Sequence, residues 1–292
     1  MNFNIVSDGA CDLLPEYTDR NKVSIVPFYV SYDGETYMKE LVDLDHDLFY
    51  RKMVEEKLVP KSSLPSVQDY VDTFEPLLME NLPIICICIT CKFSGSYNSA
   101  VTARDIILES HPDAQITIID STLNTVTQGL YVNEAVKLRD SGVSYRDAVA
   151  RLEDIKSTGR IFFTVGSMEY LVKNGRVGKL AVLAGDKLGI KPLIIMEDGE
   201  ISLGGITRSR KKSKAGVLKL VKEYFEKNNL DPKEYNFYVG TGFEYEEAAE
   251  FQKEFEEFMD VKCCENVQAR IGATVGCHTG PYPLGIGLIK KL

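Results

Sequence analysis

A short uninterrupted apolar run, residues 84–89 with the sequence IICICI, constrains the fold most strongly. Six residues are the length of a strand, and apolar side chains at every position predict a strand that is buried on both faces. Segments with helical spacing of apolar residues precede this run at residues 66–80 and follow it at residues 94–109. A doubly buried strand between two helices is typical of the centre of a parallel sheet.

The same alternation of strands and helices runs through the first half of the chain. Asp33-Gly34 is a hairpin signal that follows one of the strands. We expect further strands at residues 3–7, 23–32 and 116–119, and further helices at residues 45–57, 122–139 and 145–156. Repeated alternation predicts an α/β domain over residues 1–158, with a mostly parallel sheet and helices on both faces.

The regular alternation of strands and helices ends after Gly159. Asp198-Gly199 lies between two apolar segments and predicts a β-hairpin. We expect strands at residues 161–165, 191–196, 200–203, 236–240, near 261 and at 284–289, and helices at residues 168–173, 211–227 and 244–259. Hairpins mixed with helices predict an α+β domain over residues 159–292, so the fold class is α/β with two domains.

The composition disfavours several classes of function. The 292 residues carry 34 Lys and Arg against 43 Asp and Glu, a net charge of −9, so the chain as a whole is not drawn to nucleic acid. No apolar run approaches the roughly 18 residues that a membrane helix needs, so we expect no stable membrane insertion. The N-terminus lacks the basic and apolar regions of a signal peptide, which predicts a cytoplasmic location.

The seven cysteines fit a reducing compartment. Their number is odd, and several lie in apolar strand-like runs, which favours buried thiols over disulfides. Cys88 and Cys91 have the C-x-x-C spacing, but no second pair or nearby histidine completes a zinc site. We interpret both as core residues and expect neither a metal nor a cofactor.

Two serine-rich stretches precede predicted helices, where ligands of open α/β sheets bind. Residues 61–66 (KSSLPS) offer the hydroxyls of Ser62 and Ser63. Residues 93–98 (FSGSYN) place Ser94 and Gly95 directly after the buried strand. The glycine permits close approach of a ligand, and the helix N-terminus favours an anion. Both stretches also fit ordinary strand-to-helix turns.

A third stretch, residues 272–281 (GATVGCHTGP), is rich in glycine and contains His278. It matches neither G-x-G-x-x-G nor the Walker lysine loop. A lone histidine is more often structural, but flanking glycines bring the backbone and the imidazole into a crowded site. The other two histidines, His46 and His111, are expected to be solvated surface residues.

A basic cluster, residues 208–214 (RSRKKSK), stands out in an acidic chain. Positive charge at the start of a helix opposes the helix dipole. The simplest interpretation is a solvated helix start, and the functional one is a docking patch for an acidic partner or a phosphate.

Taken together, these stretches resemble the DegV family of bacterial lipid-binding proteins. Ser62 stands where the family usually has Thr, which keeps the hydroxyl, whereas Tyr282 stands where Gly is common and changes the loop near the head group. The matches run in order along the whole chain: Ile5-Val6-Ser7-Asp8, Ser62-Ser63-Leu64-Pro65-Ser66, Ser94-Gly95-Ser96-Tyr97, Asn174-Gly175-Arg176-Val177, Gly189-Ile190-Lys191-Pro192, Arg208-Ser209-Arg210-Lys211-Lys212 and Gly276-Cys277-His278-Thr279-Gly280-Pro281.

The resemblance implies a long-chain fatty acid (C14–C18) in a tunnel between the two domains. It also implies a substrate-carrying subunit of a bacterial fatty acid kinase that serves phospholipid synthesis, with a separate ATP-binding kinase subunit that phosphorylates the carboxylate to an acyl phosphate. By this analogy the carboxylate is bound by Ser62, Ser94, Ser63 and His278, Arg176 lies near the head group, and the kinase subunit docks on Arg208, Arg210, Lys211 and Lys212.

The physical chemistry of this arrangement is consistent. A tail of roughly 16 carbons contributes on the order of 10 kcal/mol of apolar transfer, at about 0.8 kcal/mol per buried CH₂. Neutral serine donors therefore need only orient the carboxylate, and they leave one oxygen free to attack phosphorus. His278 can donate to the carboxylate, and as a cation it would keep the acid ionised.

Two other functions remain open from the residues alone. A stand-alone serine hydrolase or esterase would use Ser62 or Ser94 as nucleophile and His278 as base. Neither serine lies in a G-x-S-x-G elbow, and no acidic third member can be named from the sequence. The other alternative is a lipid-sensing binding module without a kinase partner.

Overall fold

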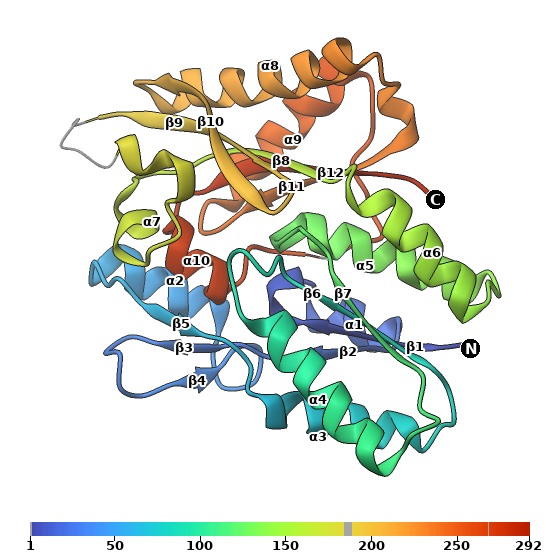
Figure 1. Cartoon of the computed structure of the whole chain (residues 1–292). Helices are drawn as coiled ribbons and strands as arrows, with labels where there is room; N and C mark the ends of the chain where they lie inside the picture. Colours follow the sequence, from blue (N-terminus) through green and yellow to red (C-terminus); the bar gives the residue numbers. More distant parts are fainter. Residues whose placement is uncertain (1, 184–188, 268) are drawn as a thin grey trace.

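The computed structural model describes residues 2–183, 189–267 and 269–292. Figure 1 shows two large β-sheets stacked one above the other, with helices outside each sheet and a further layer of helices between them. The fold class expected from the sequence is confirmed, with a parallel sheet in the first half and an antiparallel sheet in the second.

The first sheet is parallel and has the order β2-β1-β6-β7. Its apolar side chains face two separate cores, one against α3 and α4 and the other against α1, α5 and α6. The bounds are β1 Asn4–Asp8, β2 Val23–Val26, β6 Ile84–Cys88, β7 Ile116–Asp120, α1 Pro15–Arg20, α3 Val67–Leu78, α4 Ser96–Ser110, α5 Thr125–Asp140 and α6 Tyr145–Lys156. The central strand β6 is buried at every position, which confirms the prediction for the apolar run.

The second sheet is antiparallel and has the order β10-β9-β8-β12-β11. The hairpin predicted at Asp198-Gly199 joins β9 and β10. The bounds are α7 Glu169–Lys173, β8 Arg160–Thr164, β9 Lys191–Glu197, β10 Glu200–Thr207, α8 Arg210–Asn228, β11 Tyr235–Thr241, α9 Tyr245–Met259 and β12 Leu284–Lys290. The outer face of this sheet is covered by α8 and α9 (Figure 1).

A small third sheet corrects one strand prediction. The single strand expected at residues 23–32 is two strands, because Pro27 has no N–H to continue the ladder of β2. Beyond Pro27 the chain enters a three-stranded sheet of order β4-β3-β5, in which β3 and β4 form the hairpin predicted at Asp33-Gly34. The bounds are β3 Tyr29–Ser31, β4 Met38–Lys39, α2 His46–Glu55 and β5 Lys61–Ser63.

One further prediction fails near the C-terminal end, and one helix there was not predicted. The strand expected near Val261 does not form, because the Val261 N–H bonds to the carbonyl of Glu256 and ends α9. The glycine-rich stretch contains a short helix, α10 (Ala273–Thr279), that the sequence did not indicate. This helix packs against α2 and β5, which belong to the first half of the chain. The domain boundary at residue 158 stays a prediction.

Helix α5 lies between the two large sheets and is buried along nearly its whole length. Glycines permit this double contact. A Cβ at Gly129 would lie 2.8 Å from the backbone oxygen of Cys11, and a Cβ at Gly287 of β12 would collide with the hydroxyl of Thr127. A helix that is buried all round is expected in the interior of a larger fold.

No helix in the described ranges combines the length and the apolar character that a membrane crossing requires.

We predict that Leu130→Ala, in the middle of α5, lowers the free energy of unfolding by about 2–5 kcal/mol, because it leaves a cavity in a fully buried helix. Urea denaturation monitored by circular dichroism measures this change. The matched control is Leu48→Ala on α2, where the leucine is 46% exposed and a loss below about 1 kcal/mol is expected. Equal losses in the two variants would contradict the central position of α5.

Candidate functional site

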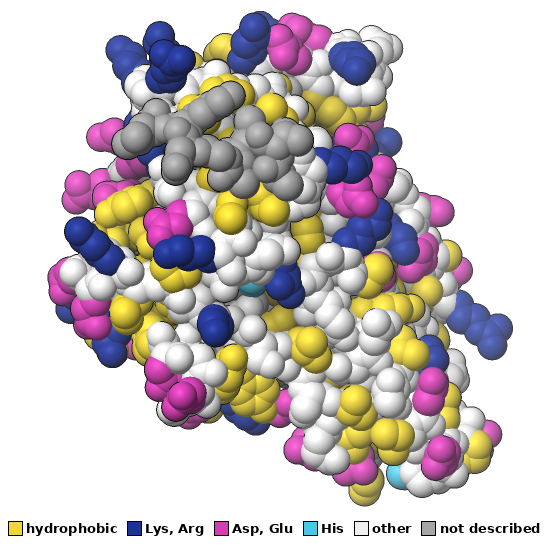
Figure 2. Space-filling view, turned by 60° about the vertical axis from the view of Figure 1, so that its left-hand side comes forward, with side chains coloured by type: hydrophobic (Ala, Val, Ile, Leu, Met, Phe, Trp, Pro, Cys, Tyr) yellow, Lys and Arg dark blue, Asp and Glu magenta, His cyan; other side chains and the backbone are white. Residues whose placement is uncertain are grey.

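A cavity lies between the two large sheets and reaches the surface at one end. Its mouth is marked by exposed residues, Ser63, Leu64 and Arg176, whereas its deep end is lined by buried ones such as Ile271 and Leu284. Most of the wall is apolar, with polar side chains at the mouth and at a few deeper positions. Figure 2 shows this side of the molecule, where a histidine side chain is visible in a hollow beside Lys or Arg side chains.

Ser62 and His278 meet at the mouth, although 216 positions separate them in the sequence. Ser62 lies on β5, and its Oγ is 3.0 Å from Nε2 of His278 on α10. Asn174, in the loop after α7, donates to the carbonyl of Cys277 at 2.7 Å and to that of Pro60 at 3.3 Å. This bridge holds the end of α10 next to the segment that leads into β5.

The imidazole of His278 is neutral near pH 7. Burial, aided by the charge of Arg176, lowers its pKa from 6.5 to about 4. The cationic form considered from the sequence is therefore disfavoured at neutral pH in the ligand-free protein. Nδ1 is buried without a partner in the described residues, and an unpaired acceptor is less costly than an unpaired buried donor. The proton thus belongs on Nε2, which donates to the oxygen of Ser62.

Ser94 is held in a similar way by its own turn. The backbone N–H of Ser96 donates to Ser94 Oγ at 3.2 Å, and the side chain of Ser96 donates to the buried carboxyl of Asp8 at 2.7 Å. Burial raises the pKa of Asp8 to about 6. Because the oxygens of Ser62 and Ser94 both accept a hydrogen bond from the protein, each keeps its O–H to donate to a ligand.

The remaining predicted site residues lie at the rim of the cavity. Ser63 is exposed and has no side-chain partner in the described part of the chain. Arg176 is exposed, and it donates through Nε to the carbonyl of Phe93 at 3.1 Å and through Nη1 to that of Asn174 at 3.0 Å. The guanidinium is therefore engaged in holding the backbone at the rim, which leaves it fewer N–H groups for bidentate binding of a carboxylate.

The basic cluster lies at the start of α8. Arg208, Lys211 and Lys212 are exposed. Arg210 instead pairs with Glu247 of α9, with Nη2 2.6 Å from Oε2, and donates to the carbonyl of Tyr282 at 2.9 Å. Arg210 thus fixes the loop that carries Tyr282 and has less freedom to bind a partner than its neighbours.

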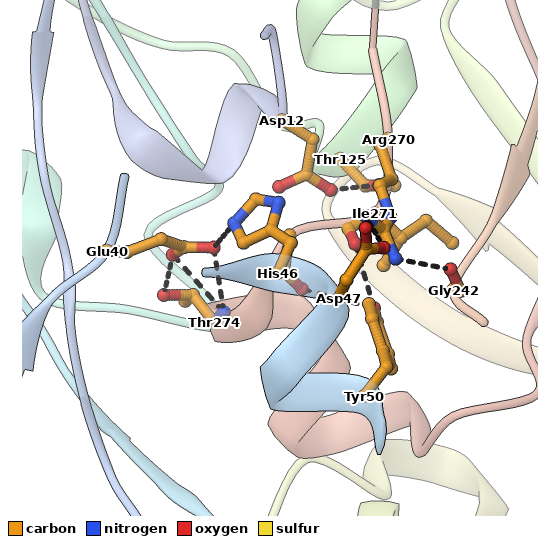
Figure 3. Close-up of polar contacts among 11 residues, drawn as sticks. Asp12, Glu40, His46, Asp47, Tyr50, Thr125, Gly242, Arg270, Ile271 and Thr274 are labelled. Carbon is orange, nitrogen blue, oxygen red and sulfur yellow. Dashed lines mark hydrogen bonds and ion pairs between the residues drawn. The ribbon is translucent and has the colours of Figure 1, made fainter. Parts of the chain in front are cut away.

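A buried polar network anchors the other end of α10 (Figure 3). Glu40 accepts hydrogen bonds from the backbone N–H and the hydroxyl of Thr274, and from His46 at 3.2 Å. We expected His46 at the solvated surface, but its side chain is only 10% exposed, because it contacts the buried carboxyl group of Glu40. His111 is exposed, as predicted.

The same network continues to the start of α5. Asp12 accepts from the hydroxyl of Thr125 at 2.5 Å, and a Cβ at Gly272 would meet both Asp12 and Glu40. Burial and the nearby charge of Glu40 raise the pKa of Asp12 well above its usual range. The network therefore fixes α10 and the first residue of α5 relative to each other.

The cysteines contribute no metal site in the described ranges. Cys88 is buried in β6, but Cys91 is exposed, which corrects its assignment to the core. No group of three or more His, Cys, Asp or Glu side chains suited to a metal ion occurs in the part of the chain that is described.

The sequence did not single out Asn124, which lines the cavity just before α5. The helix expected from residue 122 would contain Asn124, whereas α5 begins at Thr125. Its position in the sequence could have identified it. Asn124 follows the carboxyl end of the parallel strand β7, and ligands of such sheets bind at these ends.

Comparison with known proteins gives one consistent result. The family model described as the DegV family matches residues 2–291. A DegV domain-containing protein of Clostridium acetobutylicum is 30% identical over 289 residues, 98% of each chain. A crystal structure described as a stearic-acid-binding protein of Eubacterium ventriosum is 48% identical, with a TM-score of 0.94 over 99% of this chain and 98% of that one. DegV of Bacillus subtilis, described as a fatty acid binding protein, is 25% identical with a TM-score of 0.84 over the full length of both chains.

We predict that the low pKa of His278 makes stability depend on pH between about 4 and 6.5. In this window the unfolded histidine binds a proton and the folded one does not, so the free energy of unfolding falls as the pH is lowered. The full effect is about 3 kcal/mol at most. Urea denaturation of the wild type and of His278→Gln at pH 4 to 7.5 isolates it, because the variant lacks this component. Parallel pH profiles for the two proteins would contradict the prediction.

Proposed function

Because this chain belongs to the DegV family, we propose that it binds a long-chain fatty acid and presents the carboxylate to a separate ATP-dependent kinase subunit. One observation carries the proposal: a largely apolar cavity between the sheets ends at a mouth where two hydroxyls are free to donate. The solved relatives described as fatty acid binding proteins support the lipid class of the ligand.

The cavity wall suits an alkyl chain, and C14–C18 is the length that we propose. Apolar side chains come from both sheets, among them Ile89 after β6, Phe163 of β8 and Met196 of β9. Each buried CH₂ contributes about 0.8 kcal/mol, before the losses of ligand freedom. The tail thus supplies most of the binding free energy, and the head group is left to its orienting contacts.

At the mouth, the Ser62 and Ser94 hydroxyls donate to the fatty acid carboxylate. His278 donates to Ser62 and so directs the Ser62 proton toward the ligand. A carboxylate held by two neutral donors retains its negative charge and free lone pairs. One of its oxygens attacks the γ-phosphorus of ATP bound to the kinase subunit, the bond from that phosphorus to the leaving ADP oxygen breaks, and an acyl phosphate forms.

The exposed residues Arg208, Lys211 and Lys212 are the proposed docking contacts for that subunit. They are unusual in a chain with a net charge of −9, and exposed cations raise the rate of encounter with an acidic surface. Arg210 supports this patch through its ion pair with Glu247.

The pair formed by Ser62 and His278 also has the geometry of a nucleophile and a base, which favours the serine hydrolase as a second candidate. Two features oppose it. A histidine with a pKa of about 4 is a weak base at neutral pH, and its Nδ1 lacks an orienting partner in the described residues. Hydrolysis of a p-nitrophenyl ester that is lost in Ser62→Ala would favour this candidate.

We predict that the purified protein shows, in native mass spectrometry, a mass excess of one C14–C18 fatty acid. The double variant Ser62→Ala/Ser94→Ala loses this adduct or binds at least about 100-fold more weakly, since each hydrogen bond to a charged group contributes about 1.5–3 kcal/mol. The control Ser141→Ala, at the exposed end of α5, keeps the adduct. A wild-type protein that stays free of lipid after incubation with fatty acids would refute the proposed function.

We predict that Lys211→Glu/Lys212→Glu raises the KM of the kinase subunit for the loaded protein about tenfold or more, without changing fatty acid affinity. Acyl phosphate formation at low and high salt measures the effect. The matched control is Lys219→Glu/Lys222→Glu, which makes the same change of charge further along α8 at exposed positions. Unchanged turnover after reversal at 211 and 212 would remove the docking assignment and leave the lipid-binding proposal intact.

A further inference from the structure

One half-buried residue outside the cavity wall contacts two of the segments that carry the head-group residues. Asn174 follows α7 and does not itself line the cavity. Its Nδ2 donates to the carbonyl of Cys277 at 2.7 Å, directly before His278. It also donates to the carbonyl of Pro60 at 3.3 Å, two residues before Ser62. Both N–H groups of the carboxamide are thus used, one for each segment.

The turn after α7 does not require an asparagine at this position. Asn174 has φ of −97°, a negative value that other residues adopt as well. The left-handed residue that ends the helix is Gly175, with φ of 68°, and the N–H of Arg176 bonds back to the carbonyl of Leu171 at 3.0 Å. The backbone turn is therefore made by the glycine, and the side chain of Asn174 serves the contacts described above.

The carbonyl of Cys277 needs a donor from outside α10. Helical bonding would use the N–H four residues further on, but that residue is Pro281, which has none. Asn174 supplies the donor from α7, which packs closely against the end of α10. A Cβ at Gly280 would lie 2.5 Å from the ring of Tyr170.

The backbone of Asn174 is linked to the third segment, which carries Ser94. Arg176 donates through Nη1 to the carbonyl of Asn174 at 3.0 Å and through Nε to that of Phe93 at 3.1 Å. Phe93 directly precedes Ser94. The three head-group segments, which are far apart in the sequence, are therefore connected through one residue and its neighbour in the loop.

We propose that Asn174 is a positioning residue for the fatty acid carboxylate. It fixes two carbonyls at one spacing and so maintains the 3.0 Å contact between Ser62 Oγ and Nε2 of His278. The inference rests on the proposed function and deepens it. Without the bridge the two segments move independently and the hydroxyls lose their common direction. Recognition of the carboxylate then weakens, whereas the apolar wall that binds the tail is unchanged.

The test separates recognition of the head group from binding of the tail. Delipidated wild type and Asn174→Leu, which has a similar volume and no donor, are titrated with stearate and with 1-octadecanol, which has the same chain and no carboxylate. We expect the wild type to bind stearate about 100-fold more tightly than the alcohol, since hydrogen bonds to a charged group are roughly twice as strong as neutral ones. In Asn174→Leu this ratio falls about tenfold, because stearate binds more weakly and the alcohol as before.

A second measurement follows the contact between the serine and the histidine directly. In protein labelled with ¹⁵N-histidine, the Nε2–H of His278 gives a slowly exchanging signal, which is assigned by its absence in His278→Gln. We expect this proton to exchange rapidly with water in Asn174→Leu. The matched control Asn228→Leu removes a 2.7 Å bond from another asparagine side chain to a backbone carbonyl, at the end of α8. It leaves the ratio and the signal unchanged.

An unchanged ratio or an unchanged signal in Asn174→Leu would overturn the inference and leave fatty acid binding standing. Equal binding of stearate and the alcohol to the wild type would also overturn it. If Asn174→Leu does not fold, Asn174→Ala, which only shortens the side chain, is tested in the same way with the same expected result. A wild-type protein that binds neither compound would instead refute the proposed function.

Discussion

The burial of α5 between the two sheets is the constraint on which the rest of the structure depends. The helix contacts β1 of the first sheet on one side and β11 and β12 on the other. Gly129 allows close approach of the segment after β1, at Cys11, and Gly287 allows that of β12. Along α5 the space between the sheets is filled. At its N-terminal end α5 stops, and Asn124 and Val126 form part of the wall of the cavity together with residues of α10. The site is thus a consequence of where one buried helix begins.

The short helix α10 connects this interior to the surface. Its first turn is fixed by the buried carboxylate of Glu40, and its last turn carries His278 to the mouth. Burial of these groups has an electrostatic consequence, because a low-dielectric surrounding disfavours charge on the imidazole. The histidine is thereby reduced to a neutral donor, which can orient Ser62 but is a weak base at neutral pH.

Local patterns in the sequence predicted most of the helices and strands. They failed where a contact with a distant residue determines the structure or the position of a side chain. The capping box at Ser66 and the cap at Asp45 act within one helical turn, so the starts of α3 and α2 were visible in the sequence. The inward position of His46 depends on its contact with Glu40, which precedes it by six residues and forms an isolated β-bridge with Leu44. Asn124 is at the N-cap of α5 but makes no capping hydrogen bond, which the sequence does not reveal. The motif residues Ser62 and His278 could be named from the resemblance, but their contact required the packing of α10 on β5.

In the proposed function, the mouth holds a carboxylate without neutralising it. Arg176 is a cation that lines the cavity at its mouth, yet its Nε and one terminal nitrogen already donate to backbone carbonyls. A bidentate ion pair with the ligand would withdraw the lone pairs that an attack on phosphorus needs. In the proposed function, two serine hydroxyls, each oriented by a donor from the protein, fix the carboxylate in space and leave its charge in place. Affinity can then come from the apolar chain, so the strength of binding and the reactivity of the head group are set by different parts of the same cavity.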